Sequence, residues 1–408
     1  MNMLTPGRWI GGVKMVFPFT NTAMRIVCCL IVFSLTACQM PVEPVRGQIT
    51  QAADDRTPNP EPSATLFPTT AVTPLPPDPL DPVATAAQPS PSPTAAPLLR
   101  QLTTGGCCTQ PFWSPDSQRV LFLDRPSTEA ASGFWSIGLE GGAPELFTDR
   151  LGIYSRDMQL LAYPEQGQTV VERLADGQRW IIPSGGRAIS FSPDSRFVAW
   201  TEGPPGPPFD TPQRQVWISQ FDGSEARAVF AVYGGGFAGW MPDGKILING
   251  RLEQSEEAQT IWAFSLDSGE IFELAKGSRL RGLALSPDGG WLAYQVTFEM
   301  DAAGETSAEN GLWLVNTQTG ERSRLDLFGA YRWRDDHRLL IIPLDLSSTA
   351  HRIYQVDASS KEVQPITDPG VTPFKVANGD WTVSPDGKHI AFISTGDQNI
   401  WLLTLPAD

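Results

Sequence analysis

The sequence predicts an all-β fold, a seven-bladed β-propeller of four-stranded blades, preceded by an export signal and a disordered proline-rich tether. Three observations support this prediction: an apolar segment that ends at Cys38, a proline-rich stretch over residues 41–97, and a short sequence motif that recurs seven times between residues 98 and 408. A chain of 408 residues, 41% of them hydrophobic, can bury a large core. Composition therefore excludes a wholly disordered or fibrous protein.

The apolar segment near the N-terminus reads as a secretory signal. It starts at Met24 with a basic residue next to it, continues as an apolar run too short to span a bilayer, and ends in Leu-Thr-Ala-Cys at residues 35–38. This ending resembles the lipobox of bacterial lipoproteins, which implies that residues 1–37 are removed and that Cys38 carries lipid. A plain signal anchor is the alternative. Residues 1–23 have no role in this scheme, so we expect translation to start at Met24, with Met15 as the other candidate.

Residues 38–97 form the predicted tether. Fifteen of the 57 residues from 41 to 97 are proline, and Phe67 is the only aromatic residue among them. Such a segment lacks the apolar side chains that offset ordering entropy, so we expect a disordered, partly polyproline-II linker.

The repeats fill residues 98–408. Trp113-Ser114-Pro115-Asp116 is followed by an apolar run, and the last copy, Ser384-Pro385-Asp386-Gly387, is followed by another. The seven aspartates are at positions 116, 157, 194, 243, 288, 335 and 386, which are 41, 37, 49, 45, 47 and 51 residues apart. Two copies are degraded, Ser155-Arg156-Asp157 and Trp333-Arg334-Asp335.

Each repeat has the pattern of four strands. Ser-Pro-Asp-Gly suits a type I turn between two strands, because proline fixes φ at the second position and a polar first side chain bonds back to the turn. A variable loop, a third strand such as Ile400–Leu403, a glycine-containing turn and a fourth strand follow. Four strands in about 44 residues are typical of a propeller blade. Seven copies at one structural position are expected to be turn formers and not catalytic acids.

The two ends of the repeat region predict how the ring closes. The seventh repeat supplies three strands, and residues 98–103 resemble the fourth strands of other repeats. We therefore expect residues 98–103 to complete the last blade, so that no long strand edge is left open.

Through Ser-Pro-Asp-Gly-Lys and the Ile-Ala-Phe strand after it, the chain resembles the TolB-like, WD-repeat-like β-propellers over nearly all of 98–408. The resemblance implies the fold and says little about activity. Seven repeats stand here where TolB has six, and a proline-rich tether replaces its N-terminal α/β domain. Related propellers precede the hydrolase domain of prolyl-oligopeptidase-type peptidases, but Gly-x-Ser-x-Gly is absent from this sequence.

The sequence contains no recognisable catalytic or cofactor motif. Its three histidines, His337, His351 and His389, have no metal-ligand spacing, so we expect no metal and no cofactor. Cys107 and Cys108 are adjacent in a loop of an exported protein, which makes them a candidate vicinal disulfide. A structural disulfide, a redox pair and two free thiols remain the three interpretations.

Candidate ligand-binding residues come from the loops that precede the first strand of each repeat, which is the inner strand of its blade. The loops between second and third strands are long and polar, whereas the opposite turns are short. Elaboration of one face of a repeat fold is typical of its binding face, and solvated acidic loops without a function are the alternative. The polar residues expected around the mouth of the central channel of the propeller are Arg187, Arg281, Tyr331 and Lys375.

Two function classes follow. The first is a binding or scaffolding propeller that recognises a protein, peptide or glycan, anchored through acylated Cys38 to the outer side of a bacterial cell membrane. The alternative is a hydrolase of glycans or lactones with a site assembled at the mouth of the propeller. A net charge of −15 without clusters of Lys and Arg argues against nucleic acid as a partner, and we expect a monomeric propeller.

Overall fold

The computed structural model describes residues 98–106, 109–204, 211–297, 307–345 and 347–407. They belong to one compact unit, Ser92–Asp408. Within these ranges the chain forms strands, and no helix is long and apolar enough to cross a membrane. The predicted signal (1–37), the tether (38–97) with Cys38, and the pair Cys107 and Cys108 lie outside the described residues.

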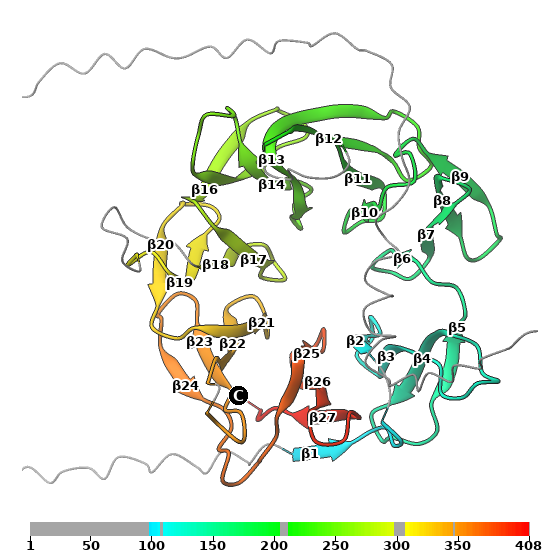
Figure 1. Cartoon of the computed structure of the whole chain (residues 1–408), viewed down its shortest axis with the longest axis vertical. Helices are drawn as coiled ribbons and strands as arrows, with labels where there is room; N and C mark the ends of the chain where they lie inside the picture. The colour runs from blue at the N-terminus through cyan, green and yellow to red at the C-terminus, as the bar shows by residue number, and fades with distance from the viewer. Residues whose placement is uncertain (1–97, 107–108, 205–210, 298–306, 346, 408) are drawn as a thin grey trace, which may run out of the picture. The chain divides into compact units, whose positions relative to one another are not determined.

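The strands make six antiparallel sheets that follow one another around a common centre, a propeller-like arrangement (Figure 1). Sheet I contains β2 (Thr109–Trp113), β3 (Arg119–Asp124), β4 (Gly133–Gly138) and β5 (Glu145–Thr148). Sheet II contains β6 (Ile153–Tyr154), β7 (Leu160–Glu165), β8 (Gln168–Arg173) and β9 (Arg179–Ile182). In both sheets the hydrogen-bonded order equals the chain order, as the repeat pattern predicts.

Sheet III departs from the prediction because it joins seven strands. These are β10 (Ser190–Phe191), β11 (Phe197–Glu202), β12 (Gln213–Gln220), β13 (Arg227–Trp240), β14 (Ile246–Arg251), β15 (Gln259–Phe264) and β16 (Ile271–Gly277). The first part of β13, up to Tyr233, pairs with β12, and the part from Tyr233 to Trp240 pairs with β14. The register shifts between Tyr233 and Gly236, where glycines let the strand bend and continue without a turn.

The prediction of seven separate four-stranded blades is therefore wrong for the third and fourth repeats. The structure contains five four-stranded sheets and one seven-stranded sheet.

The other three sheets have four strands each. Sheet IV contains β17 (Leu280–Leu285), β18 (Trp291–Val296), β19 (Gly311–Asn316) and β20 (Arg322–Leu325). Sheet V contains β21 (Gly329–Trp333), β22 (Arg338–Pro343), β23 (Tyr354–Asp357) and β24 (Val363–Pro365). Sheet VI contains β25 (Val376–Val383), β26 (His389–Ser394), β27 (Ile400–Thr404) and β1 (Leu98–Gln101).

Sheet VI is made from both ends of the described chain. β1 runs antiparallel to β27, with Leu98 opposite Thr404 and Gln101 opposite Trp401 (Figure 1). The amide of Leu102 then donates to the carbonyl of Ile400 at 2.9 Å. The first described strand thus covers the edge that β27 would otherwise leave open.

The core lies between successive sheets. Clusters of buried hydrophobic side chains fill the interfaces VI/I, II/III, III/IV, IV/V and V/VI, and a further cluster lies within sheet III. Because both faces of a sheet pack against neighbours, second strands such as β3 and β22 carry consecutive buried residues instead of an alternating pattern. This explains the continuous apolar runs that follow the repeated turns.

The tryptophan before the turn ties neighbouring repeats together. The indole Nε1 of Trp113 donates to the carbonyl of Thr382 at 3.4 Å, that of Trp240 to Ser190 at 3.1 Å, and that of Trp333 to Ala284 at 2.9 Å. In each case the acceptor lies on the inner strand of the preceding repeat. An indole that donates to a backbone carbonyl of the neighbouring repeat fixes the distance between two inner strands.

Candidate functional site

The two ends of the sheets have different chemistry. At one end, here called the turn end, the repeated turns join each inner strand to its second strand. At the other end, called the loop end, each inner strand begins and each second strand finishes. For example, the first residue of β17, Leu280, pairs with the last residue of β18, Val296, and Gly329 pairs with Pro343 in the same way. The loops between second and third strands therefore start at the loop end.

The repeated aspartates shape the turns, as predicted. In the last turn the Oγ of Ser384 donates to Oδ1 of Asp386 at 2.6 Å, and the amide of Lys388 donates to the same carboxylate at 3.2 Å. The amide of His389 closes the turn by donating to Ser384 Oγ at 2.9 Å. The serine–aspartate bond also occurs at Ser114, Ser155, Ser192 and Ser286.

These bonds keep the aspartates ionised. Burial raises the pKa of Asp386, but the hydrogen bonds from Ser384 and Lys388 outweigh it and leave the pKa below its ordinary value. For Asp116, the bond from Ser114 is the largest influence and lowers the pKa. A carboxylate that is committed to its own turn is poorly suited to general acid catalysis near neutral pH.

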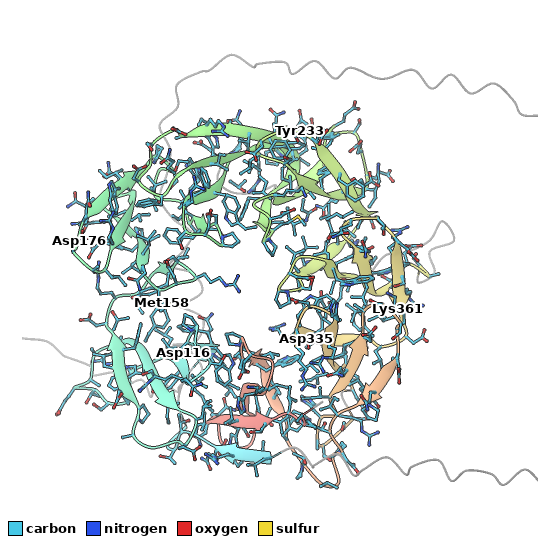
Figure 2. The ribbon with its side chains drawn as sticks, turned by 180° about the vertical axis from the view of Figure 1, so that it is seen from behind. Asp116, Met158, Asp176, Tyr233, Asp335 and Lys361 are labelled. Atoms are coloured by element: carbon cyan, nitrogen blue, oxygen red, sulfur yellow. The ribbon has the colours of Figure 1, made fainter. Side chains whose placement is uncertain are left out.

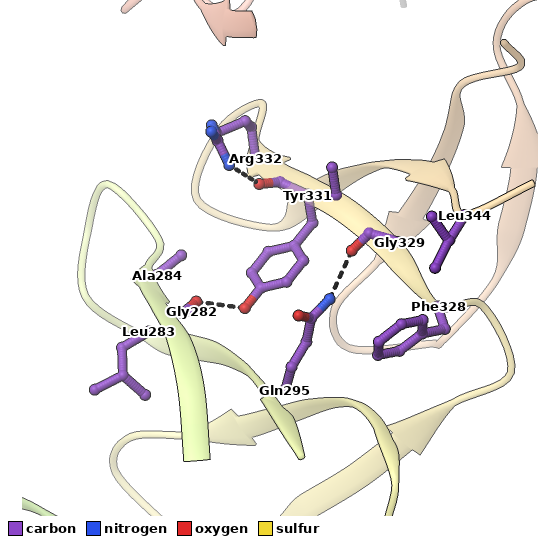
Figure 3. A pocket seen from close by; sticks show the side chains of 10 residues that line it. Gly282, Leu283, Ala284, Gln295, Phe328, Gly329, Tyr331, Arg332 and Leu344 are labelled. Carbon is purple, nitrogen blue, oxygen red and sulfur yellow. Dashed lines mark hydrogen bonds between the residues drawn. The ribbon is translucent and has the colours of Figure 1, made fainter. Parts of the chain in front are cut away.

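A groove between sheets IV and V at the loop end has the features of a binding site. Its volume is about 610 Å³, within the range of small-ligand sites. Phe328 and Leu344 offer apolar surface in it, with 38% and 65% of their surface exposed. The lining residues are Gly282, Leu283, Ala284, Gln295, Phe328, Gly329, Ala330, Tyr331, Arg332 and Leu344 (Figure 3).

Two polar side chains on the walls hold the sheets together. The phenol of Tyr331 donates to the carbonyl of Gly282 on β17, and the amide of Gln295 donates to the carbonyl of Gly329 at 2.7 Å (Figure 3). Burial raises the pKa of Tyr331, so its phenol stays neutral. Tyr331, predicted to frame the mouth, is therefore buried and positions the groove through this bond instead of presenting a free hydroxyl.

Gly282 makes this contact possible. It has φ +65°, which side-chain-bearing residues rarely adopt, and it lies where the register of β17 shifts against β18. A Cβ on this residue would be 2.7 Å from the Tyr331 hydroxyl. The bulge thus brings the backbone of β17 against β21.

Arg332 provides a cation at the groove. Its Nη1 donates to the carbonyl of Tyr331 at 2.7 Å, and its guanidinium lies 5.4 Å from the ring centre of Trp381 on β25. The side chain is exposed, in contrast to its neighbours Tyr331 and Trp333. A guanidinium supported by an aromatic face keeps donors for an anionic group.

The other predicted binding residues do not converge on one point. Arg281 is exposed on β17 beside Gly282, and its guanidinium makes no hydrogen bond or ion pair with the other described residues. Arg187 donates to the carbonyl of Ser184 at 3.0 Å and lies 3.6 Å from Glu202. Lys375 donates to the carbonyl of Ser348 at 2.8 Å. Of the four residues, Tyr331 lines the groove and Arg281 precedes the lining residue Gly282 in sequence, whereas Arg187 and Lys375 are not among the lining residues.

Sequence reasoning missed Arg332, Gln295, Phe328 and Leu344. The alternation in Tyr331-Arg332-Trp333 carried a signal, because two aromatic residues on one face of a strand place the arginine on the other. Phe328, Gln295 and Leu344 carried none, since they come together only when sheets IV and V pack.

The described residues contain no group of three or more His, Cys, Asp and Glu that could hold a metal ion. Nδ1 of His351 accepts a bond from the amide of Val376 at 3.2 Å. The ring of His389 stacks on Trp113, with ring centres 6.2 Å apart.

No protein-family model matches the chain, and no curated protein matches its sequence. Among solved structures, an oligogalacturonate lyase from Vibrio parahaemolyticus is 13% identical over 76% of this chain and 97% of its own, with a TM-score of 0.53. An oligogalacturonate lyase in complex with manganese is 15% identical over 76% and 98%, with a TM-score of 0.52. A TolB structure from Agrobacterium tumefaciens is 17% identical over 74% and 92%, with a TM-score of 0.34. At these identities the similarity concerns the fold alone.

Proposed function

We propose that this chain is a ligand-binding propeller and that its ligand, a protein, peptide or glycan, binds in the groove between sheets IV and V. The observation that carries the proposal is the composition of this groove, whose lining combines exposed apolar surface from Phe328 and Leu344 with the cationic residue Arg332. Arg281, which precedes the lining residue Gly282 on β17, is a second exposed cation next to the lining. The ligand that fits is one with an apolar face and an anionic group.

Binding of acidic and neutral probes tests this proposal. We would measure binding of acidic oligosaccharides, neutral oligosaccharides and acidic peptides by titration calorimetry, and include oligogalacturonate because two structurally similar proteins are lyases of that name. We expect acidic probes to be preferred and Arg332→Ala to weaken their binding at least tenfold. Arg196→Ala is the matched control, because Arg196 is exposed at the turn end. Equal binding by both variants would contradict the assignment of the groove.

The same mixtures distinguish the alternative function, a hydrolase of glycans or lactones. Analysis of the oligosaccharides after incubation would show shortened chains if the propeller is an enzyme, and unchanged chains if it only binds.

We also propose that the protein is a lipoprotein anchored through Cys38 on the extracytoplasmic side of a bacterial membrane. The support is the sequence Leu-Thr-Ala-Cys after an apolar run. We expect a fatty-acid analogue to label the wild type, which fractionates with membranes, and not Cys38→Ala. Equal labelling of the two would overturn the proposal.

Finally, we propose that sheet III counts as two blades that share β13, which gives seven blades in all. The support is the pairing of β13, whose first part serves β12 as an outer strand and whose last part serves β14 as an inner strand. Trp240 in that last part makes the same bond to the preceding inner strand as Trp113 and Trp333 make in other sheets.

A further inference from the structure

The interface between sheets I and II holds a second cavity, of about 390 Å³. The described core clusters span the other sheet interfaces. The cavity is lined by Phe112, Trp113, Pro115, Phe134, Gly152, Tyr154, Ser155, Arg156, Met158 and Pro385. Met158 and Asp116, labelled in Figure 2, mark the two neighbouring turns beside it. The cavity is thus at the turn end, away from the groove between sheets IV and V.

The walls of this cavity are aromatic rings whose polar ends are already used. Phe134 lies edge-on to Phe112 at 5.3 Å and to Tyr154 at 5.9 Å between ring centres. The Tyr154 hydroxyl donates to the carbonyl of Arg150 at 3.0 Å, and the Trp113 indole donates to Thr382. What remains for an occupant is ring surface, which favours another aromatic ring.

Arg156 supplies the charge at this cavity. It stands where five of the repeats have proline, so the degraded copy of the motif brings an arginine to the cavity. Arg156 is exposed and makes no hydrogen bond or ion pair with the other described residues. The nearby carboxylate of Asp157 is engaged by Ser155 Oγ at 2.5 Å and Ser195 Oγ at 3.3 Å.

The arginine of the other degraded copy behaves differently. Arg334 is buried, and it donates to the carbonyls of Gly387 and Pro406 at 3.0 and 2.8 Å. Arg334 therefore has a structural role, whereas the contacts of the described residues give Arg156 none. Neighbouring turns elsewhere are also bonded to each other, as where the amide of Asp386 donates to Ser117 Oγ at 3.1 Å.

We propose that the cavity between sheets I and II binds a small aromatic carboxylate, with its ring against Phe112, Phe134 and Tyr154 and its carboxylate on Arg156. Guanidinium and carboxylate form charge-assisted, bidentate hydrogen bonds, and a cavity of this size lies in the usual range for small ligands. The occupant contacts both sheets, so its binding also holds the two sheets together.

Two probes and three variants of the full chain test this site. The probes are 2-naphthoate and the neutral 2-naphthylmethanol, titrated by calorimetry. We expect 2-naphthoate to bind at least tenfold more tightly than the alcohol. Arg156→Glu should weaken the binding of 2-naphthoate at least tenfold, and Arg156→Lys should weaken it less because a single point charge remains. Arg196→Glu should leave the binding of 2-naphthoate unchanged. Arg156 has no partner among the described residues, so its variants should melt like the wild type without probe.

Location is tested separately by hydrogen exchange. Saturating 2-naphthoate should slow amide exchange in β2 and β6 of the wild type and raise its melting temperature, and should do neither in Arg156→Glu. Absence of saturable binding, equal binding of the two probes, equal loss in Arg196→Glu, or protection confined to β17 and β21 would each overturn the proposal.

Discussion

A serine and an aspartate two residues apart close five of the seven turns, and the two exceptions show why the pair matters. Where Met241 or Arg334 replaces the serine, the turn is one residue shorter: the amide of Met241 bonds to Lys245, whereas the amide of Ser384 bonds to His389. The serine hydroxyl therefore bridges the longer turn, and the aspartate fixes the hydroxyl.

The lowered aspartate pKa values predict a loss of stability in acid. A carboxyl group whose pKa is depressed in the folded state stabilises the fold above its unfolded pKa, near 3.9, and this stabilisation is lost as pH falls through the folded pKa. We expect Asp386→Asn to melt below the wild type at pH 7, and the difference to shrink as pH falls below about 4. Melting curves from pH 7 to pH 3 measure this. A constant difference across that range would contradict the role given to the carboxylate.

Substitutions of two glycines at the same turn position distinguish the effect of backbone strain on stability from the effect of packing. Gly289 and Gly244 both have positive φ, +77° and +86°, but a Cβ would lie 2.6 Å from Pro242 Cδ only at Gly289. We expect Gly244→Ala to lower the free energy of unfolding by about 1–2 kcal/mol because of backbone strain. Gly289→Ala should lower it by about 1–3 kcal/mol more because of overpacking. Chemical denaturation of both variants measures the difference. Equal losses would mean that the turns of neighbouring repeats can separate freely.

At the scale of strands, the inner strands are joined by donors from the next repeat. Trp113, Trp240 and Trp333 each reach a carbonyl one repeat back, and Tyr331 adds a second bond at the groove. Within the described residues, strands of different repeats share a backbone ladder only in sheet III. Between sheets IV and V, the bonds of Trp333 and Tyr331 therefore act together with the packed cluster to set the width of the groove.

The pairing of β1 with β27 predicts the effect of removing the first strand. Deleting residues 98–103 would expose the edge of β27 and remove Leu102, which is 4% exposed, from the cluster between sheets VI and I. We expect a lower melting temperature or aggregation, because an unpaired strand edge recruits other chains. Deleting residues 41–97 is the control and should leave the melting curve unchanged. An unaltered curve after the first deletion would contradict closure by this strand.

At the scale of the whole ring, the interfaces are not equivalent. Sheets IV and V share a large cluster together with the bonds of Trp333, Tyr331 and Gln295. Among the described residues no such cluster spans sheets I and II, which meet at the aromatic cavity. Local stability follows buried apolar contact, so opening should start where that contact is smallest.

Hydrogen exchange without ligand tests this uneven stability. We expect amides of β5 and β6 to exchange faster than those of β20 and β21, which occupy the corresponding places at the IV/V interface. Mass-spectrometric exchange over a time course measures both pairs in one experiment. Equal exchange at the two interfaces would show that the cavity does not weaken the ring.

The sequence by itself determined the all-β class, the sevenfold repeat and the structural role of the aspartates. These features depend on interactions within a few residues: a turn bond from Ser384 to Asp386, or an apolar run after it. The same locality made the pairing of residues 98–101 with the last repeat visible, because strand patterns repeat.

Only the tertiary structure decided how the repeats join and where the cavities lie. The continuous strand β13 arises from pairing on both of its sides, which no turn motif reports. Tyr331 turned out to be a buried structural donor, and Arg332 beside it faces the other way, because packing of β21 against β17 and β25 assigns the two faces. Such outcomes depend on contacts between residues about 50 positions apart, as between Tyr331 and Gly282, and local sequence patterns carry no record of them.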